Sequence, residues 1–293
     1  MKGNENVNIL FCGDGRIADG VLITTLSLLK NSDERLNIYI LTASFEYGGK
    51  RYDGVSTAFA RFLLDVVRKA DMQSSVRLFD ISSLFAAELP TANMGTRFTP
   101  CCMLRLYADL VPELPDKLLY LDNDVICRRD PAGFYAQDIV DYELAGVLDY
   151  YGSWFFKKKP VSIRRDYINS GVLLLNMKKI RETGLFAACR ARCAEVEMFM
   201  PDQSAINKTA RYKKICPRRF NEQRQTKDDT VFRHFTTTFR FFPKFRAVTV
   251  KPWDIDRLHS VLSVYEFDEI IGEYLGLKTL LESEEAKNEN KYA

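Results

Sequence analysis

The feature that most constrains the fold is an alternation of apolar strands and amphipathic helices over the first 130 residues. Short apolar runs, each typical of a buried strand, alternate with segments whose apolar residues recur every three to four positions. The expected strands cover residues 7–12, 36–42, 75–81 and 118–121, and the expected helices cover 19–30, 56–70 and 102–110. This order predicts an α/β fold with a parallel sheet and helices on both faces.

The pattern is looser in the second half of the chain. Further strands are expected at 144–148, 172–175, 213–216 and 230–235, and helices at 185–199, 202–209 and from 256 onward. The last dozen residues are polar and charged, and we expect them to be solvated and frayed. No internal repeat is visible.

Length and charge exclude several classes of protein. A chain of 293 residues can bury a large core without disulfides or structural zinc. Its 42 basic and 39 acidic residues nearly balance, which argues against a nucleic-acid partner. The seven cysteines have no regular spacing and are expected to be free thiols. No apolar stretch is long enough to cross a bilayer and the start does not resemble a signal peptide, so we expect a cytoplasmic protein.

Two acidic residues end the expected strand at 118–121. In the segment KLLYLDNDVIC, Asp122 and Asp124 directly follow the apolar run and repel each other unless a cation lies between them. Carboxylate oxygens suit hard divalent ions such as Mg²⁺, Mn²⁺ and Ca²⁺. Ligands of parallel sheets gather at the carboxyl ends of strands, where the turn after Cys12 also lies. The two turns are therefore expected to share one ligand.

Two other interpretations of the Asp-x-Asp pattern stay open at this point. One is an ordinary turn at the end of a strand, in which the aspartates cap local backbone groups. The other is a haloacid-dehalogenase-like phosphatase, which uses the first aspartate as a nucleophile on a phosphoryl group and the second as an acid. Those enzymes usually carry the motif on their first strand, whereas here three expected strands precede it.

Five segments, in order along the chain, resemble glycosyltransferase family 8, the group that includes glycogenin and bacterial lipopolysaccharide galactosyl- and glucosyltransferases. They are ILFCGD, MLRLYADLVPELPDKLLYLDNDVIC, YINSGVLLLNMKKIR, PDQSAIN, and the histidine of RHF followed later by KPW. Each segment is modest alone, and together they are specific. The resemblance extends from about Asn8 to Asp256.

This resemblance implies a single Rossmann-like fold of the GT-A type, with a mixed, mostly parallel central sheet. It implies a catalytic domain at 1–257 and a C-terminal helical tail at 258–293. The implied activity is transfer of glucose or galactose, with retention, from a UDP-sugar to a glycan or lipid-linked acceptor such as a cell-surface polysaccharide or lipopolysaccharide precursor. A non-catalytic sugar-nucleotide binder is the alternative, and peripheral contact with the inner face of a membrane stays open. The oligomeric state is not predicted.

The resemblance also assigns site residues. The implied metal is Mn²⁺, with Mg²⁺ as the alternative, because a shell of carboxylate and imidazole ligands favours manganese. The implied metal ligands are Asp122, Asp124 and His234. The implied donor-binding residues are Cys12, Asp14, Arg105, Asn123, Asn169, Ser170, Gly171 and Lys251. Asp149, Asp202 and Gln203 are placed on the sugar and acceptor side, with no nucleophile assigned among them.

Three features depart from the family pattern or lie outside it. Relatives keep the histidine and the lysine in one tight loop with a glycine, whereas residues 235–250 separate His234 from Lys251 here, without the glycine. The basic cluster Arg211–Arg219 is either a solvated face or a surface for an anionic acceptor or membrane. The segment Trp154–Pro160 is a candidate acceptor-side loop.

Overall fold

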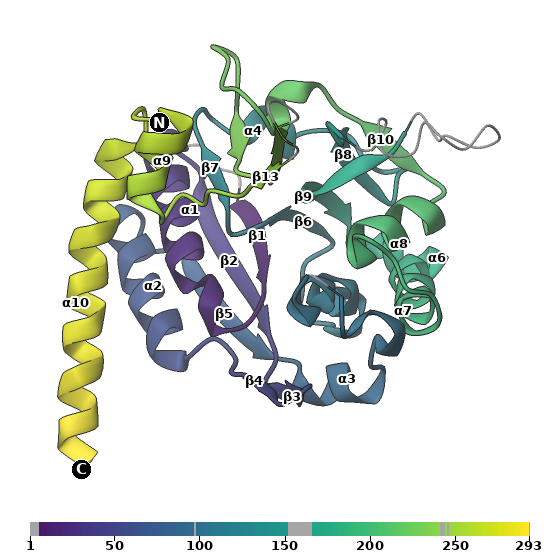
Figure 1. Cartoon of the computed structure of the whole chain (residues 1–293), viewed down its shortest axis with the longest axis horizontal. Helices are drawn as coiled ribbons and strands as arrows, with labels where there is room; N and C mark the ends of the chain where they lie inside the picture. Colours follow the sequence, from purple (N-terminus) through teal and green to yellow (C-terminus); the bar gives the residue numbers. More distant parts are fainter. Residues whose placement is uncertain (1–5, 97, 152–165, 241–243, 245, 293) are drawn as a thin grey trace.

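A mixed seven-stranded sheet lies at the centre of the computed structural model, which describes residues 6–96, 98–151, 166–240, 244 and 246–292 (Figure 1). The strand order is β10-β8-β9-β6-β1-β2-β5. Their bounds are β1 (Asn6–Cys12), β2 (Arg35–Thr42), β5 (Ser75–Asp80), β6 (Lys117–Leu121), β8 (Leu144–Leu148), β9 (Ile168–Asn176) and β10 (Lys213–Ile215). Only β9 runs antiparallel to its neighbours in this sheet, β6 and β8, so the expected mostly parallel α/β sheet is confirmed.

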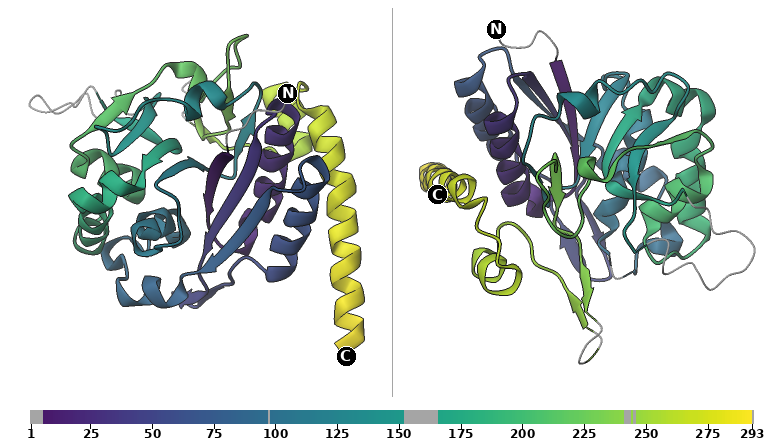
Figure 2. Two further views of the ribbon diagram at one scale, coloured as in Figure 1. Left: turned by 180° about the vertical axis from the view of Figure 1, so that it is seen from behind. Right: turned by 90° about the horizontal axis from the view of Figure 1, so that it is seen from above.

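Helices cover both faces of the sheet (Figure 2). One face carries α1 (Ala18–Asn31) and α2 (Thr57–Ala70), with the long α10 (Asp268–Tyr292) alongside them. The other face carries the 3₁₀ helix η3 (Pro100–Leu110), α6 (Met177–Thr183), α7 (Leu185–Glu195) and α8 (Pro201–Thr209). Strand alternation divides the core in two, because Ile9 and Phe11 pack towards α1 and α2 while Leu10 packs towards η3.

Several boundaries differ from the expectations. The helix expected at 102–110 has 3₁₀ geometry, and Arg105 Nε donates to the Cys102 carbonyl, which a regular α-helix would use for its own ladder. The helix expected at 185–199 ends at Glu195. The chain end that we expected to fray continues α10 to Tyr292. The segment Trp154–Pro160 lies outside the described residues.

Three small two-stranded sheets were not expected as pairs. They are β3 (Phe45–Tyr47) with β4 (Lys50–Tyr52), β7 (Val125–Cys127) with β11 (Phe232–His234), and β12 (Thr238–Arg240) with β13 (Arg246–Val248). The β7–β11 pair is the important one for the site. Its antiparallel register places His234 opposite Val125, and therefore next to the aspartate pair.

The remaining short elements connect these layers. They are α3 (Ser82–Ala87), α4 (Ala132–Tyr135), α9 (Ile255–Leu262), and the 3₁₀ turns η1 (Gly15–Ile17), η2 (Thr91–Asn93) and η4 (Arg218–Phe220). The division expected after residue 257 falls within α9. Among the helices of the described ranges, none combines the length and the apolar character that a membrane span requires.

Candidate functional site

A cavity of about 490 Å³ opens at the carboxyl ends of β1 and β6. Cys12 and Asp14 follow β1, and Asp122 to Asp124 follow β6, as parallel strands that end at one sheet edge require. The other predicted residues that line it are Arg105, Asp149, Asn169, Ser170, Asp202, Gln203, His234 and Lys251. Gly171 lies just beneath, since a Cβ on it would come within 2.1 Å of His234 Cε1.

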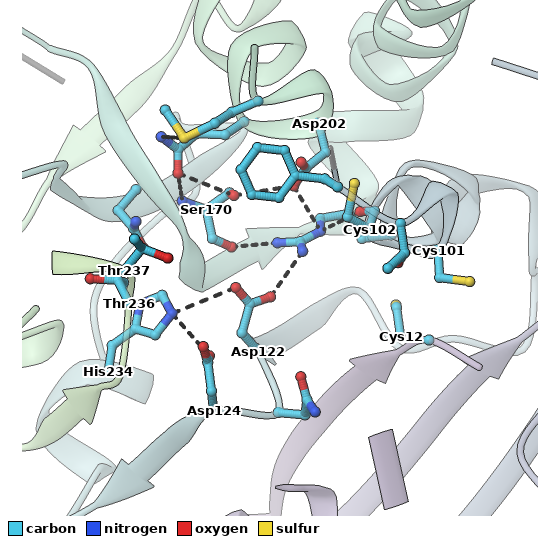
Figure 3. A pocket seen from close by; sticks show the side chains of 18 of the residues that line it. Cys12, Cys101, Cys102, Asp122, Asp124, Ser170, Asp202, His234, Thr236 and Thr237 are labelled. Atoms are coloured by element: carbon cyan, nitrogen blue, oxygen red, sulfur yellow. Dashed lines mark hydrogen bonds and ion pairs between the residues drawn. The ribbon is translucent and has the colours of Figure 1, made fainter. Parts of the chain in front are cut away.

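Asp122, Asp124 and His234 converge on one point, with one ligand atom from each within 4.8 Å of the others (Figure 3). His234 Nε2 lies 3.0 Å from Asp124 Oδ1 and 3.7 Å from Asp122 Oδ2. β6 delivers the aspartates and β11 delivers the histidine from more than a hundred residues away. The side chains of Asp124 and His234 are buried, so water screens their charges only weakly.

The hydrogen bonds around His234 decide which ring nitrogen can bind a cation. Asn221 Nδ2 donates to Asn169 Oδ1 at 2.9 Å, so Asn221 Oδ1 is the acceptor that faces His234 Nδ1 at 3.2 Å. Nδ1 therefore carries a proton, and Nε2 is the ring nitrogen that faces the two carboxylates. With its lone pair on Nε2, the ring can serve as a third ligand to a cation held between the carboxylates.

Asp124 gives a second indication of a cation. Its Oδ1 is buried and has no hydrogen-bond partner among the described residues. Buried carboxylate oxygens are normally satisfied, and a metal ion is one way to satisfy them. Two carboxylates and an imidazole nitrogen therefore fit a divalent transition metal such as Mn²⁺ better than they fit Ca²⁺.

Lys251 contacts one of the two aspartates. Its ammonium pairs with Asp124 Oδ2 and donates to the Phe235 carbonyl at 3.2 Å. The long segment between His234 and Lys251 contains the β12–β13 hairpin, whose strands run out and back. Burial alone would raise the pKa of Asp124, but the ammonium of Lys251 outweighs it and holds that pKa below its usual range. Asp124 is therefore ionised at neutral pH.

Arg105 lies in the wall of the cavity, beneath the predicted ligands. Arg105 is 5% exposed. Its guanidinium bonds to Asp122 Oδ1 at 2.9 Å and to the Ser170 carbonyl at 2.6 Å, and lies 3.3 Å from Asp202 Oδ2. The ring of Tyr120 lies 4.1 Å below it. Arg105 thus fixes Asp122 and ties β6, β9 and α8 together.

The predicted sugar-side residues form a connected network on β9 and α8. Asp149 Oδ2 accepts from Asn169 Nδ2 at 3.0 Å and from Gln203 Nε2 at 3.4 Å. Gln203 Oε1 accepts the backbone N–H of Ser170 at 3.0 Å, and Ser170 Oγ donates to Asp202 Oδ2 at 3.2 Å. The buried carboxylate of Asp202 is bound by Ser170 and Arg105, so it stabilises the wall of the cavity. Asp149 is half-buried and faces the cavity.

The turn after β1 holds a preformed ion pair. The buried carboxylate of Asp14 accepts from Arg16 Nε at 3.0–3.1 Å and from Cys101 Sγ at 3.3 Å. Arg16 also lies 5.1 Å from the Tyr52 ring centroid, with most of its side chain exposed. Burial raises the pKa of the Cys12 thiol, which therefore stays protonated. The turn presents a guanidinium edge and neutral groups to a ligand.

Sequence analysis missed two buried polar residues that contact the predicted metal ligands, and also an aromatic pair in the cavity lining. Asn221 is fully buried and positions His234, but it lies after η4 outside any recognisable motif. Tyr120 donates its hydroxyl to Asp122 Oδ1 at 2.6 Å, and on sequence grounds it counted only as a strand residue. Phe98 and Phe199 form an edge-to-face pair in the cavity lining, with centroids 6.2 Å apart.

Comparison with known proteins places this arrangement among relatives. A family model described as glycosyl transferase family 8 matches residues 8–236. The chain is 24% identical over 261 residues to the lipopolysaccharide 1,2-glucosyltransferase of Escherichia coli, covering 80% of this chain and 73% of the relative. It is 24% identical over 189 residues to a glycosyltransferase-like protein of Haemophilus influenzae, covering 62% of this chain and 52% of that relative. The chain thus spans about half the length of the Haemophilus protein.

Solved structures share the fold. The galactosyltransferase LgtC, in complex with donor and acceptor sugar analogs, superposes with a TM-score of 0.63 at 20% identity, covering 92% of this chain and 96% of LgtC. GlyE of Streptococcus pneumoniae superposes with a TM-score of 0.55 at 17% identity, covering 93% of this chain and 64% of GlyE. These likenesses confirm the GT-A type fold that the sequence predicted.

Proposed function

The chain belongs to glycosyl transferase family 8, and from this membership we propose that it transfers glucose or galactose from a UDP-sugar to a glycan acceptor with retention. The names of the relatives support a cell-surface acceptor, since one is a lipopolysaccharide glucosyltransferase and another was solved with donor and acceptor sugar analogs. A lipid-linked acceptor would bring the protein to the inner face of a membrane in the cytoplasm.

The observation that carries the proposal is the convergence of Asp122, Asp124, His234 and Lys251 at one end of the cavity. We assign the first three as ligands of a divalent metal, Mn²⁺ before Mg²⁺. When bound, the ion neutralises charge on the departing nucleoside diphosphate.

Lys251 and Arg105 have different roles in this proposal. The side chain of Lys251 is 31% exposed and its ammonium pairs with Asp124, so it would add positive charge where the leaving group departs. Arg105 is nearly fully buried and holds the carboxylate of Asp122 in place. Arg105 is therefore a positioning residue, although the sequence suggested direct contact with the donor.

The remaining residues bind and orient sugar and nucleotide. Asn123 follows the first aspartate and lines the cavity beside Cys12 and Asp14, which suits the nucleotide side. Asp149, Asn169 and Gln203 offer a carboxylate and two amides for sugar hydroxyls on the opposite side. Gly171 leaves room for the His234 ring. No nucleophile is assigned among Asp149, Asp202 and Gln203.

Membership of the family displaces the phosphatase interpretation of the Asp-x-Asp pattern. The β7–β11 pairing agrees with this, because a histidine and a lysine meet the aspartates. A non-catalytic sugar-nucleotide binder differs from an enzyme only in turnover, and the experiment below separates them.

The test is Mn²⁺-dependent release of UDP from UDP-glucose and UDP-galactose by the purified protein. The double variant Asp122→Asn/Asp124→Asn keeps the shapes but removes both charges, and we expect turnover to fall at least about 100-fold. Asp141→Asn is the matched control, because Asp141 is exposed in the loop before β8. Unchanged turnover in the double variant would contradict the site, and tight UDP binding without any turnover would indicate the binder.

A further inference from the structure

Strand β11 separates two cavities. Its successive side chains point to opposite faces, so His234 faces the site described above while Arg233 faces a second cavity of about 580 Å³. We call this second space the arginine cavity. Its defining residues are Tyr150, Arg218, Glu222, Arg224, Lys227 and Arg233. Arg218 belongs to the basic cluster that the sequence singled out.

Positive charge predominates in the arginine cavity. Four cationic side chains line it against a single carboxylate, that of Glu222. Within the part of the chain that the structure describes, no carboxylate oxygen lies within 4.0 Å of a charged nitrogen of these four side chains. Like charges gathered in a partly enclosed space repel one another, so a bound anion would lower their energy.

Two guanidinium nitrogens in the cavity lack hydrogen-bond partners. Arg233 is only 5% exposed, and its Nε is buried with no acceptor among the described residues, while its Nη1 donates to the Glu222 carbonyl at 3.1 Å. Arg218 Nη1 is also buried and unpartnered in the same part of the chain. Burial lowers the pKa of Arg233 to about 10, so the group is still charged at neutral pH. These two nitrogens are closed to solvent, so the nearly buried guanidinium of Arg233 acts on the cavity through its positive charge.

Tyr150 gathers two of the cations. The guanidinium carbons of Arg218 and Arg224 lie 5.6 Å and 4.5 Å from its ring centroid, and Arg224 Nη1 donates to its hydroxyl. Stacking on an aromatic ring fixes the plane of a guanidinium and leaves its edge nitrogens available. Planar forks of this kind match the oxygens of a phosphate.

Besides β11, three more stretches of chain line both cavities. Tyr150 lines the arginine cavity while its neighbour Tyr151 lines the first, and Arg224 lines the arginine cavity while Gln223 lines the first. Gln223 Oε1 accepts the backbone N–H of Tyr150 at 2.8 Å and so joins the two rims. Likewise, Thr237 lines the first cavity and Thr238 lines the arginine cavity. A ligand in one cavity therefore lies next to a ligand in the other, on the side of Asp149.

We propose that the arginine cavity binds a phosphate group carried by the acceptor sugar, and so selects phosphorylated acceptors. The acceptor role rests on the proposed function, whereas the phosphate site rests on the cavity alone. Arg218 and Arg224 supply the hydrogen-bond donors, and Arg233 and the exposed Lys227 add positive charge.

The test compares the binding of glucose 6-phosphate, glucose and inorganic phosphate by calorimetry, each with and without UDP and Mn²⁺ to fill the first cavity. We expect glucose 6-phosphate to bind at least about tenfold more tightly than glucose, also with UDP present. The double variant Arg224→Gln/Lys227→Gln should weaken this binding at least about tenfold. Both residues are exposed, so the variant is expected to fold.

The control double variant Arg61→Gln/Lys208→Gln removes the same charge from exposed positions on α2 and α8 and should leave sugar phosphate binding unchanged. Equal binding of glucose and its phosphate, no binding of the phosphate, or indifference to Arg224→Gln/Lys227→Gln would each overturn the proposal. The proposal would also be overturned if the protein binds phosphatidylglycerol vesicles through Arg224 and Lys227 but does not bind the sugar phosphate. If the wild-type protein binds glucose 6-phosphate but does not bind UDP, the proposed function is refuted and the phosphate site is not.

Discussion

Gly171 offers the sharpest test of how the predicted metal ligands are held. A Cβ built on it would lie 2.1 Å from His234 Cε1 and 2.7 Å from Asp122 Oδ2. Restoring an ordinary contact of 3.4 Å would require the imidazole ring to move by about 1.3 Å. The ring is buried and bonded to Asn221, so it cannot yield without losing its alignment with the carboxylates. Gly171→Ala therefore perturbs two predicted ligands through a single methyl group.

A misplacement of this size is expected to weaken Mn²⁺ binding about 100-fold, or about 2.8 kcal/mol. Overpacking should also cost about 1–3 kcal/mol of unfolding free energy, which a domain of this size can tolerate. Manganese titration followed by electron paramagnetic resonance measures the affinity, and urea denaturation measures the stability. Gly133→Ala is the control, since its Cβ would meet nothing within 4 Å. Wild-type Mn²⁺ affinity in Gly171→Ala would refute the placement of His234.

Three further predictions concern the groups around the site. Asn221→Leu removes the acceptor of His234 Nδ1 and should weaken Mn²⁺ binding about 10–100-fold in the same titration, and an unchanged affinity would contradict the assigned tautomer. Arg105→Met leaves Asp122 and Asp202 without their buried partner and should cost about 3–5 kcal/mol of unfolding free energy in urea, whereas a loss below about 1 kcal/mol would show that the pairs are dispensable. Burial raises the pKa of Cys101 to about 12, so this thiol stays protonated at pH 8 and should react slowly with a thiol reagent until the protein is denatured; rapid labelling of Cys101 in the native protein, located by peptide mapping, would be inconsistent with that burial.

The part of the fold visible in the sequence is the part governed by local periodicity. The apolar runs that became β1, β2 and β6 are bounded by turns and charged residues, so their ends were predictable to within a residue or two. The same logic placed Asp122 and Asp124 at the sheet edge beside Cys12. Strand β9 was expected as 172–175 but begins at Ile168, because the polar residues Asn169 and Ser170 hid its start.

Long-range pairing was not visible in the sequence. The pairing of β11 with β7 depends on contacts between segments about a hundred residues apart, and β11 is only three residues long. The return of Lys251 to Asp124 depends on the β12–β13 hairpin, which no turn motif announced. Asn221 carried no signal at all, since a polar residue in a loop is usually exposed and this one is fully buried.

Only part of the arginine cavity was visible in the sequence. The run RYKKICPRR drew attention to Arg218, but Arg224, Lys227 and Arg233 lie outside that run and join it only through the β11 register and the loop before it. Tyr150, which stacks on two of the guanidiniums, comes from a segment far away in sequence. Folding therefore assembled a cationic site from residues that looked unrelated.

We propose that Asp122, Asp124 and His234 hold a divalent cation against the diphosphate of a bound nucleotide. The most direct measurement is a crystal structure with Mn²⁺ and UDP, with anomalous diffraction recorded to locate the manganese. We expect one strong anomalous peak between the two carboxylates and His234 Nε2, next to the diphosphate of UDP. UDP bound with no manganese at these three residues, or manganese bound elsewhere, would contradict it.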